Sequence, residues 1–322
     1  MAVCESIKPG SGVKISPGLL MLLMFLGLLF AAAPSGAQAV QAYVSQTGHG
    51  AVNWYKGLIR STGAGSAGNA ALEANATRTA ALREAKIAAR TGLLRTLRSV
   101  MVDSDLSVGQ RMAKSKELRE TLLGEVHNSY ILNRTNLSGG KVQIAAGISL
   151  WGRISRLVIP ASVWYQSLDS SEEKASNATE ETTSWLQEQR EMRAQSFTGL
   201  VVDARNVSLQ PSLICRISDS QGGVIYGPEV VNPKIAVNKG MAAYVQDIGS
   251  ALNSPRSGDS PLVLVAERAG GGNGCHIVLS EEGSRHFQPR PQELDFLRRA
   301  QVLVVMGQGS PDTEMTEYRL PR

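Results

Sequence analysis

The stretch Gly63-Ala-Gly-Ser-Ala-Gly-Asn-Ala-Ala71 decides the fold, because it joins a candidate strand over 52–59 to the longest helical pattern of the chain. It reads G-x-G-x-x-G-x-A, which is the order of glycines in a dinucleotide-binding turn. In such a turn, the amides at the start of a helix bind a pyrophosphate. Two readings are therefore open: a nucleotide site, or a sharp turn into a closely packed helix.

Three features of the flanking sequence argue against a nucleotide site. The strand before the turn contains Asn53-Trp-Tyr-Lys56, whereas a buried parallel strand is a continuous apolar run. The helical pattern runs on for roughly thirty residues, longer than a typical crossover helix. The next acidic residues, Asp103 and Asp105, come about twice as far along as a ribose-binding acid would. We therefore expect no cofactor, and we expect the glycines to turn the chain sharply into the helix.

The helical pattern covers 69–101 and has one apolar stripe. Small and aliphatic residues recur there at steps of three and four, which places them on one side of a helix: Leu82, Ala85, Ala89, Leu93, Leu97 and Val100. Basic residues, Arg95 among them, lie off the stripe. Four of them form a candidate face for an anionic partner, namely Arg83, Lys86, Arg90 and Arg98. The alternative is an ordinary solvated helix face.

Shorter patterns complete a first module over residues 40–165. The expected elements are strands over 52–59, 101–108, 130–137, 142–150 and 153–159 and a second helix over 110–127. The strand over 142–150 alternates most regularly between apolar and smaller or polar residues. These elements predict an α+β fold in which a long alanine-rich helix packs on a small antiparallel sheet.

Residues 196–309 predict a second α/β module. Strands are expected over 200–202, 213–217, 224–226, 262–266, 277–279 and 302–306, and helices over 241–252 and 292–299. Residues 166–195 are rich in Ser, Thr, Glu and Gln and predict a polar linker. Residues 310–322 predict a loose tail.

Residues 1–39 have the three-part layout of a secretory signal peptide. Lys8 and Lys14 precede an uncharged apolar run over 19–33, and Ala37-Gln-Ala39 supplies small residues for cleavage. An uncleaved anchor is the alternative, although the run is short for a membrane span. We expect an exported protein in the periplasm or at the outer-membrane periphery, with no stable transmembrane segment after cleavage. The net charge of +5 is too small to indicate a nucleic-acid partner.

Two cysteines, Cys215 and Cys275, lie outside the expected signal peptide. An exported protein meets an oxidising compartment, where the two could form a disulfide. They could equally remain separate small apolar side chains, and sequence spacing alone does not decide between the two.

A resemblance to a known bacterial module covers about 52–159. A strand and a G-x-G turn are followed by Ala80-Ala-x-x-x-Ala85-Lys-x-x-Ala89, Leu93-Leu94 and Val100-x-Val-Asp-Ser104. This order resembles the N-terminal domain of the flagellar assembly protein T and the related LPP-type exported lipoproteins. The resemblance implies the long helix on a small antiparallel sheet. The chain departs from the group because it lacks a lipid-acceptor cysteine and the full three-domain plan of the flagellar protein.

Parts of the second module are similar to a segment found in longer members of that group. These parts are Phe197-Thr-Gly-Leu-Val-Val-Asp-Ala-Arg205, Ile225-Tyr-Gly227, 241–252 and 260–263. Envelope or flagellar basal-body proteins are the partners that the resemblance implies.

A search for catalytic and metal-binding patterns finds none with the required spacing. Gly147-Ile-Ser-Leu-Trp151 lacks the second glycine of a nucleophile elbow. No spacing rule unites Cys215, Cys275, His276 and His286 in a metal site. Asp203 and Arg205 either form a loop ion pair or line a groove. We therefore expect a protein without catalytic, cofactor-binding or metal-binding residues.

The patterns together predict a non-enzymatic envelope protein that acts as a structural or assembly factor through protein–protein contacts. One alternative is a periplasmic binding module for a small molecule or glycan, with a cleft between the modules lined by Trp151, Trp164 and Asp203. Another is a hydrolase with an unfamiliar site, marked by an acid or histidine whose pKa is strongly shifted in a cleft.

Overall fold

The computed structural model describes residues 39–66, 74–164, 197–287 and 294–307. Residues 1–38 of the expected signal peptide, and the expected linker and tail, lie outside these described residues. Residues Val40–Arg322 cluster by their contacts into one compact unit, which holds a five-stranded and a seven-stranded sheet. The fold is α+β with two modules, as the sequence predicts. No helix in the described ranges is long and apolar enough to cross a membrane.

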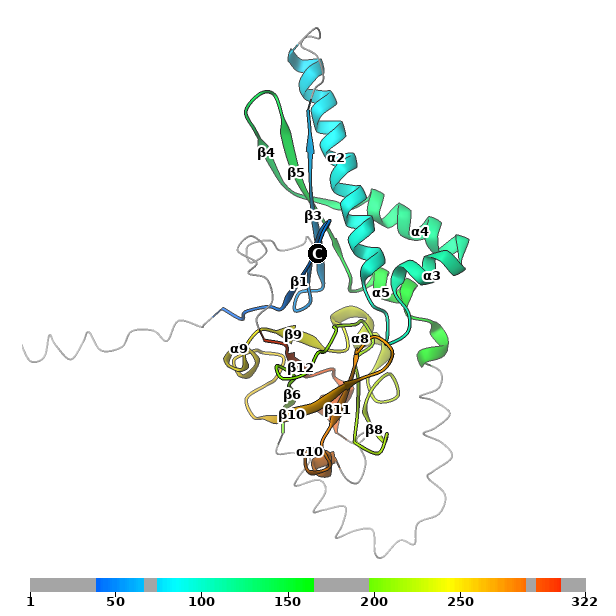
Figure 1. Ribbon diagram of the computed structural model, residues 1–322, viewed down its shortest axis with the longest axis vertical. Coiled ribbons are helices and arrows are strands. Elements are labelled where there is room, and N and C mark those ends of the chain that lie inside the picture. Colours follow the sequence, from blue (N-terminus) through cyan, green and yellow to red (C-terminus); the bar gives the residue numbers. More distant parts are fainter. Residues whose placement is uncertain (1–38, 67–73, 165–196, 288–293, 308–322) are drawn as a thin grey trace, which may run out of the picture. The chain divides into compact units, whose positions relative to one another are not determined.

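The first sheet is antiparallel throughout and has the strand order β1-β2-β3-β5-β4. Its strands are β1 (Val44–Thr47), β2 (Gly50–Asn53), β3 (Leu58–Gly65), β4 (Tyr130–Asn136) and β5 (Val142–Ser149). The long helix α2 (Ala74–Ser99) runs along β3 and β5 (Figure 1). Three further helices complete the module: α3 (Val108–Lys114), α4 (Lys116–His127) and α5 (Arg153–Val158).

The first two glycines of the opening stretch lie inside β3, so the expectation that they form the turn is wrong. They are needed because α2 lies directly on the strand. A Cβ on Gly63 would stand 2.2 Å from the backbone nitrogen of Ala89, and one on Gly65 would stand 2.1 Å from the carbonyl oxygen of Ala81. The expected close packing is confirmed, since Ala81, Ala85 and Ala89 are fully buried.

Two expected strands of the first module differ from the structure: one is divided into two strands, and the other is mostly a loop. The stretch 52–59 is split between β2 and β3 by a turn over 54–57, in which Gly57 has a φ of 63°. The stretch 101–108 is mostly a loop, because the Asp103 carboxylate accepts hydrogen bonds from the amides of Asp105 and Leu106. A side chain that bonds its own backbone in this way competes with strand pairing.

Two helical segments of the first module also differ from expectation. The stretch 153–159 forms α5 instead of a strand, because Gly152 turns the chain with a φ of 80° and Ser155 donates a hydrogen bond to the Leu150 carbonyl. The helix expected over 110–127 is two helices. Ser115 separates them, and its hydroxyl accepts a hydrogen bond from the Leu118 amide as the N-cap of α4.

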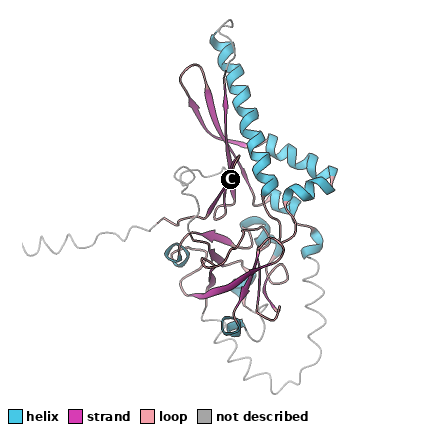
Figure 2. Cartoon of the chain, viewed as in Figure 1, coloured by secondary structure: helices cyan, strands magenta, loops and turns pink. Residues whose placement is uncertain are grey.

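The second sheet is mixed and has the strand order β8-β7-β11-β10-β6-β12-β9. Its strands are β6 (Gly199–Asp203), β7 (Arg216–Ser218), β8 (Val224–Tyr226), β9 (Ala243–Val245), β10 (Pro261–Gly270), β11 (His276–Leu279) and β12 (Val302–Val305). Short helices flank the strands (Figure 2). They are α8 (Pro233–Lys239), α9 (Ile248–Leu252), α10 (Glu281–Ser284), the 3-10 helix η1 (Arg285–Phe287) and α11 (Asp295–Arg298).

The helix expected over 241–252 is wrong in its first half. Residues 241–245 are all buried, and 243–245 form β9, which pairs in parallel with β12. A continuous buried run suits a strand covered on both faces and does not suit an amphipathic helix. Helix α9 begins only at Ile248, after Asp247 caps it by accepting a hydrogen bond from the Ser250 amide.

Backbone hydrogen bonds and a shared core join the two modules. The Leu213 amide donates to the Met101 carbonyl at 3.0 Å, and the Gly152 amide donates to the Val237 carbonyl at 2.7 Å. One apolar core continues from the face beneath α2 into the second sheet.

The segment over 41–43 lies along the free edge of β9 before the chain enters the first sheet. The Tyr43 amide donates to the Tyr244 carbonyl at 3.0 Å, and the Gln246 amide donates to the Gln41 carbonyl at 2.9 Å.

Candidate functional site

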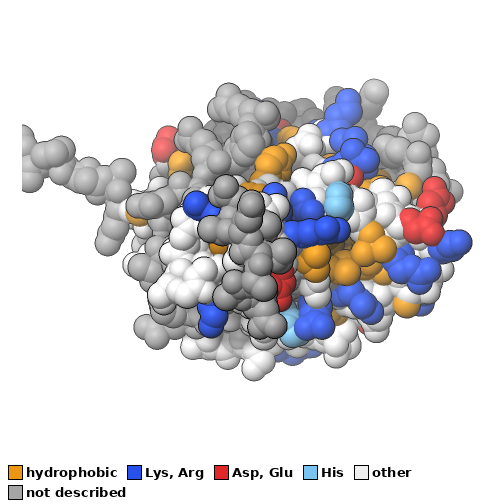
Figure 3. Space-filling model, turned by 90° about the horizontal axis from the view of Figure 1, so that it is seen from above, with side chains coloured by type: hydrophobic (Ala, Val, Ile, Leu, Met, Phe, Trp, Pro, Cys, Tyr) orange, Lys and Arg blue, Asp and Glu red, His pale blue; other side chains and the backbone are white. Residues whose placement is uncertain are grey.

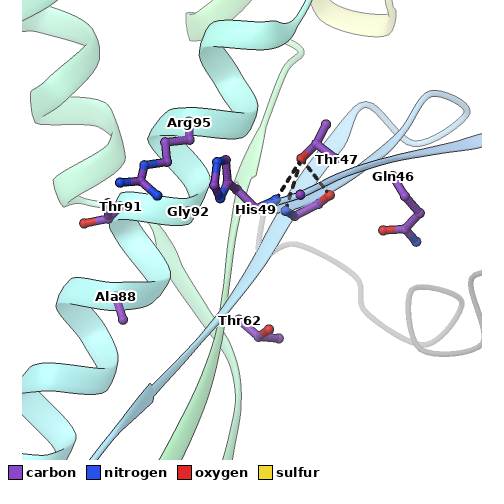
Figure 4. A pocket seen from close by; sticks show the side chains of 10 residues that line it. Gln46, Thr47, His49, Thr62, Ala88, Thr91, Gly92 and Arg95 are labelled. Carbon is purple, nitrogen blue, oxygen red and sulfur yellow. Dashed lines mark hydrogen bonds between the residues drawn. The ribbon is translucent and has the colours of Figure 1, made fainter.

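A polar pocket of about 570 Å³ opens at the β1–β2 hairpin, where β2 begins, beside β3 and α2 (Figure 4). Three elements line it: the β1–β2 hairpin, β3 and one side of α2. Its lining residues are Gln46, Thr47, Gly48, His49, Gly50, Thr62, Ala88, Thr91, Gly92 and Arg95. The lining contains two basic side chains and no acidic one, so the pocket suits an anionic group.

Local sequence holds the hairpin against the strand and the helix. The Thr47 hydroxyl donates to the Gly50 carbonyl at 2.9 Å, and the Ser61 hydroxyl donates to the His49 carbonyl at 2.6 Å. Gly92 lets α2 approach, because a Cβ there would stand 2.0 Å from the Ser61 hydroxyl oxygen. Hydrogen bonds and close packing therefore hold the hairpin, β3 and α2 together around the pocket.

The outer edge of β3 beside this pocket has no strand partner among the described residues. β2 pairs with β3 only over 58–60, whereas β5 pairs with the other edge over the whole of 58–65. Thr62 and Ala64, in the unpaired part, are exposed. An unpaired edge offers main-chain groups to an added extended segment.

Helix α2 carries a concentrated positive charge. Its basic residues are Arg78, Arg83, Lys86, Arg90, Arg95 and Arg98, against one acidic residue, Glu84. Within the part of the chain that the structure describes, none of these cations forms an ion pair with a carboxylate. Seen from above, the described surface shows many more Lys and Arg than acidic side chains (Figure 3).

The structure brings together three of the four residues expected to face an anionic partner. Arg83, Lys86 and Arg90 follow one another at steps of three and four and so share one side of α2. Arg98 lies in the last turn, beside Gly109 at the start of α3. Arg95 lies on the other side of α2, in the pocket.

Most of the pocket could not be predicted from the sequence, because its lining residues are scattered over three elements. The β1–β2 hairpin over 44–53 carries a turn signal, Gly48-His-Gly50, that could have located it. Nothing in the spacing of His49, Thr91 and Arg95 shows that they meet.

Asp203 and Arg205 form the loop ion pair that was one of their two readings. Arg205 Nε lies 2.9 Å from Asp203 Oδ1, and Nη2 lies 2.6 Å from Oδ2. The hydrogen bonds from Arg205 lower the pKa of the Asp203 carboxyl. The ion pair with Arg205 thus explains the lowered pKa of Asp203, and Asp203 lies outside the pocket.

Among the described side chains, Cys215, Cys275 and His276 do not come together as a metal site. Cys215 and Cys275 are free, buried thiols. Burial, together with Arg216 and Arg268, lowers the pKa of the His276 imidazole. No three His, Cys, Asp or Glu side chains in the described ranges are placed to hold a metal ion. The side chain of His286 lies outside the description.

The three residues expected to line a cleft between the modules do not line the pocket. Trp151 fills the space between Gly57 and Gly240, where a Cβ on either glycine would overlap its ring. Trp164 packs half-buried against the core. Asp203 is held in its ion pair at the end of β6.

Comparison with family models matches the second module. A family model described as the second domain of Treponema pallidum Tp0624 matches residues 199–308, about a third of the chain. No curated protein matches the chain. The matched segment runs from β6 through β12, so the second module is similar to that spirochaete domain, and α2 and its pocket lie outside the match.

Proposed function

We propose that this chain is a non-enzymatic exported envelope protein that works as a structural or assembly factor by binding other proteins. The observation that carries the proposal is the set of basic residues on α2 that have no acidic partner within the described chain. The sequence resemblance to exported flagellar and lipoprotein modules supports envelope or flagellar basal-body proteins as the partners.

The charge on α2 favours an acidic protein surface as the partner. A single exposed ion pair contributes at most about 1 kcal/mol, so no one cation would hold a complex. Several positive charges on one helix, however, raise the rate of encounter with an acidic surface and orient that surface as it approaches. The binding should therefore weaken steeply as the salt concentration rises.

The β3 edge and the pocket supply the directional part of such a contact. An extended segment of the partner can bind the main-chain groups of residues 61–65, and an acidic side chain beside it can meet Arg95 in the pocket. Arg83, Lys86 and Arg90 lie on another side of α2 and extend the charged surface.

Fractionation of the native host tests the proposal. We would tag the C-terminus, isolate flagellar basal bodies and total envelopes, and measure the protein in each by mass spectrometry. The unaltered chain should be enriched in one of these fractions. The variant Arg83→Gln/Lys86→Gln/Arg90→Gln should lose at least half of that enrichment.

A charge-matched variant controls for the loss of positive charge itself. Lys114→Gln/Arg119→Gln/Arg134→Gln removes the same charge from exposed positions on α3, α4 and β4 and should fractionate like the unaltered chain. An unaltered chain that stays soluble and is absent from both fractions would contradict the assembly role. Basal-body enrichment would select the flagellar version of it.

The pocket itself favours one alternative function, a periplasmic binding module for a small molecule or glycan. Its volume lies within the usual range of ligand sites, about 300–1,000 Å³. Its polar lining with Arg95 and His49 suits an acidic sugar or carboxylate. This alternative predicts that anionic saccharides raise the Tm of the purified protein and that Arg95→Gln abolishes the rise. The assembly proposal predicts no such rise.

A further inference from the structure

The strand register places Cys215 and Cys275 opposite each other. Each cysteine comes one residue before a strand, β7 and β11 respectively, and these strands pair in parallel with Arg216 opposite His276. Neighbouring strands lie about 4.8 Å apart, and opposite residues of a parallel pair point to the same side. That separation is within the Cα–Cα range of disulfides, about 4.4–6.8 Å.

The two thiols also share one buried environment. The Tyr244 hydroxyl lies close to both cysteine side chains, and the Cys275 thiol donates a hydrogen bond to the Asn273 carbonyl at 3.8 Å. Tyr244 in turn donates from its hydroxyl to the Ser212 carbonyl at 3.3 Å. Both sulfurs therefore belong to one cluster, although the cysteines are far apart along the chain.

We propose that Cys215 and Cys275 form a disulfide that links β7 to β11 in the exported protein. These are the only cysteines of the chain outside the expected signal peptide, and the fold makes them neighbours. The oxidising compartment that the link needs rests on the export proposed above. The link would join two strands whose own pairing spans three residue pairs.

The oxidation balances as an exchange with the disulfide of a thiol oxidoreductase. One cysteine thiolate attacks that disulfide and forms a mixed disulfide, and the second cysteine then attacks the mixed disulfide. The two thiols lose two protons and two electrons, one sulfur–sulfur bond forms, and the oxidoreductase is reduced to its dithiol.

The burial of both cysteines determines at which stage of folding the disulfide can form. Cys215 is 1% exposed and Cys275 is 3% exposed, so a protein oxidant cannot reach either in the folded chain. Burial also raises the pKa of Cys215 to about 12 and that of Cys275 to about 11, which keeps both as unreactive thiols. The disulfide therefore forms while the chain folds, before the second sheet closes.

Refolding under defined redox conditions tests the pairing. We would refold the reduced chain over residues 40–322, which omits Cys4, from denaturant in a mixture of oxidised and reduced glutathione and count free thiols after denaturing again. We expect none, a mass lower by about 2 Da, and a cross-linked peptide pair containing Cys215 and Cys275. Reduction should lower the Tm by about 5 °C or more.

The variants Cys215→Ala, Cys275→Ala and the double variant provide the controls. Each should show a Tm that reduction does not change, whatever its absolute stability. Two free thiols in the oxidatively refolded unaltered chain would overturn the pairing. A chain that pairs during refolding but is reduced when isolated from its host would instead overturn the proposed export.

Discussion

At the scale of single residues, α2 and β3 come into close backbone contact at two glycines of the strand. Gly63 and Gly65 bring the backbone of β3 against Ala81, Ala85 and Ala89 of α2. A Cβ at either glycine would have to displace helix backbone, which cannot rotate away as a flexible side chain can.

We therefore expect Gly65→Ala to lower the free energy of unfolding by about 1–3 kcal/mol or more. Gly48→Ala is the matched control, because a Cβ at Gly48 meets nothing within 4 Å. The control should change stability by less than about 0.5 kcal/mol. Urea unfolding of both variants measures the difference, and equal stabilities would contradict the close packing of α2 on β3.

The Asp203–Arg205 pair predicts a pH dependence. Because Arg205 lowers the pKa of Asp203 below its ordinary value of 3.8, the pair stabilises the fold at neutral pH and ceases to do so as the carboxyl is protonated. Asp203→Asn should lower the Tm at pH 7, and the difference from the unaltered chain should shrink below about pH 4. A Tm difference that stays constant with falling pH would show that the carboxylate charge is not involved.

At the scale of elements, a cap and not an apolar pattern ends α3 and begins α4. Ser115→Ala removes the hydrogen bond to the Leu118 amide and should destabilise the fold by about 1 kcal/mol. Thr121→Ala, within the same helix, removes only a bond to the Glu117 carbonyl and should be close to neutral. Thermal unfolding compares the two, and a neutral Ser115→Ala would mean that the cap contributes nothing.

Elements with a clear period could be predicted from the sequence, and those decided by local turn chemistry could not. The apolar stripe of α2 and the alternation of β5 are strong signals because each faces one core. The stretch 153–159 carries a strand-like composition, and the turn at Gly152 that makes it α5 is a backbone feature. The pocket had no signal of its own, since its basic groups come from two separate elements.

At the scale of the whole molecule, the second module depends on residues outside its own stretch of sequence. Residues 41–43 pair with the edge of β9, and the Gln246 amide donates to the Gln41 carbonyl. A chain that begins at residue 44 should therefore lose hydrogen-exchange protection at Gln246, whereas one that begins at residue 40 should keep it. Mass spectrometry of exchanged peptides resolves the two, and equal protection would contradict the pairing.

The segment over 41–43 also has a consequence for the order in which the chain can fold. The Gln41 amide donates to the hydroxyl of Ser250, so this early segment receives its partner only after 209 further positions have been made. Because a chain is synthesised from its amino terminus, this segment stays unpaired until β9 and α9 have also been synthesised. Such a late, long-range closure slows folding and leaves the edge of β9 open to chaperones and to other chains in the meantime. Completion of this one edge thus marks that the chain has emerged at least as far as Ser250.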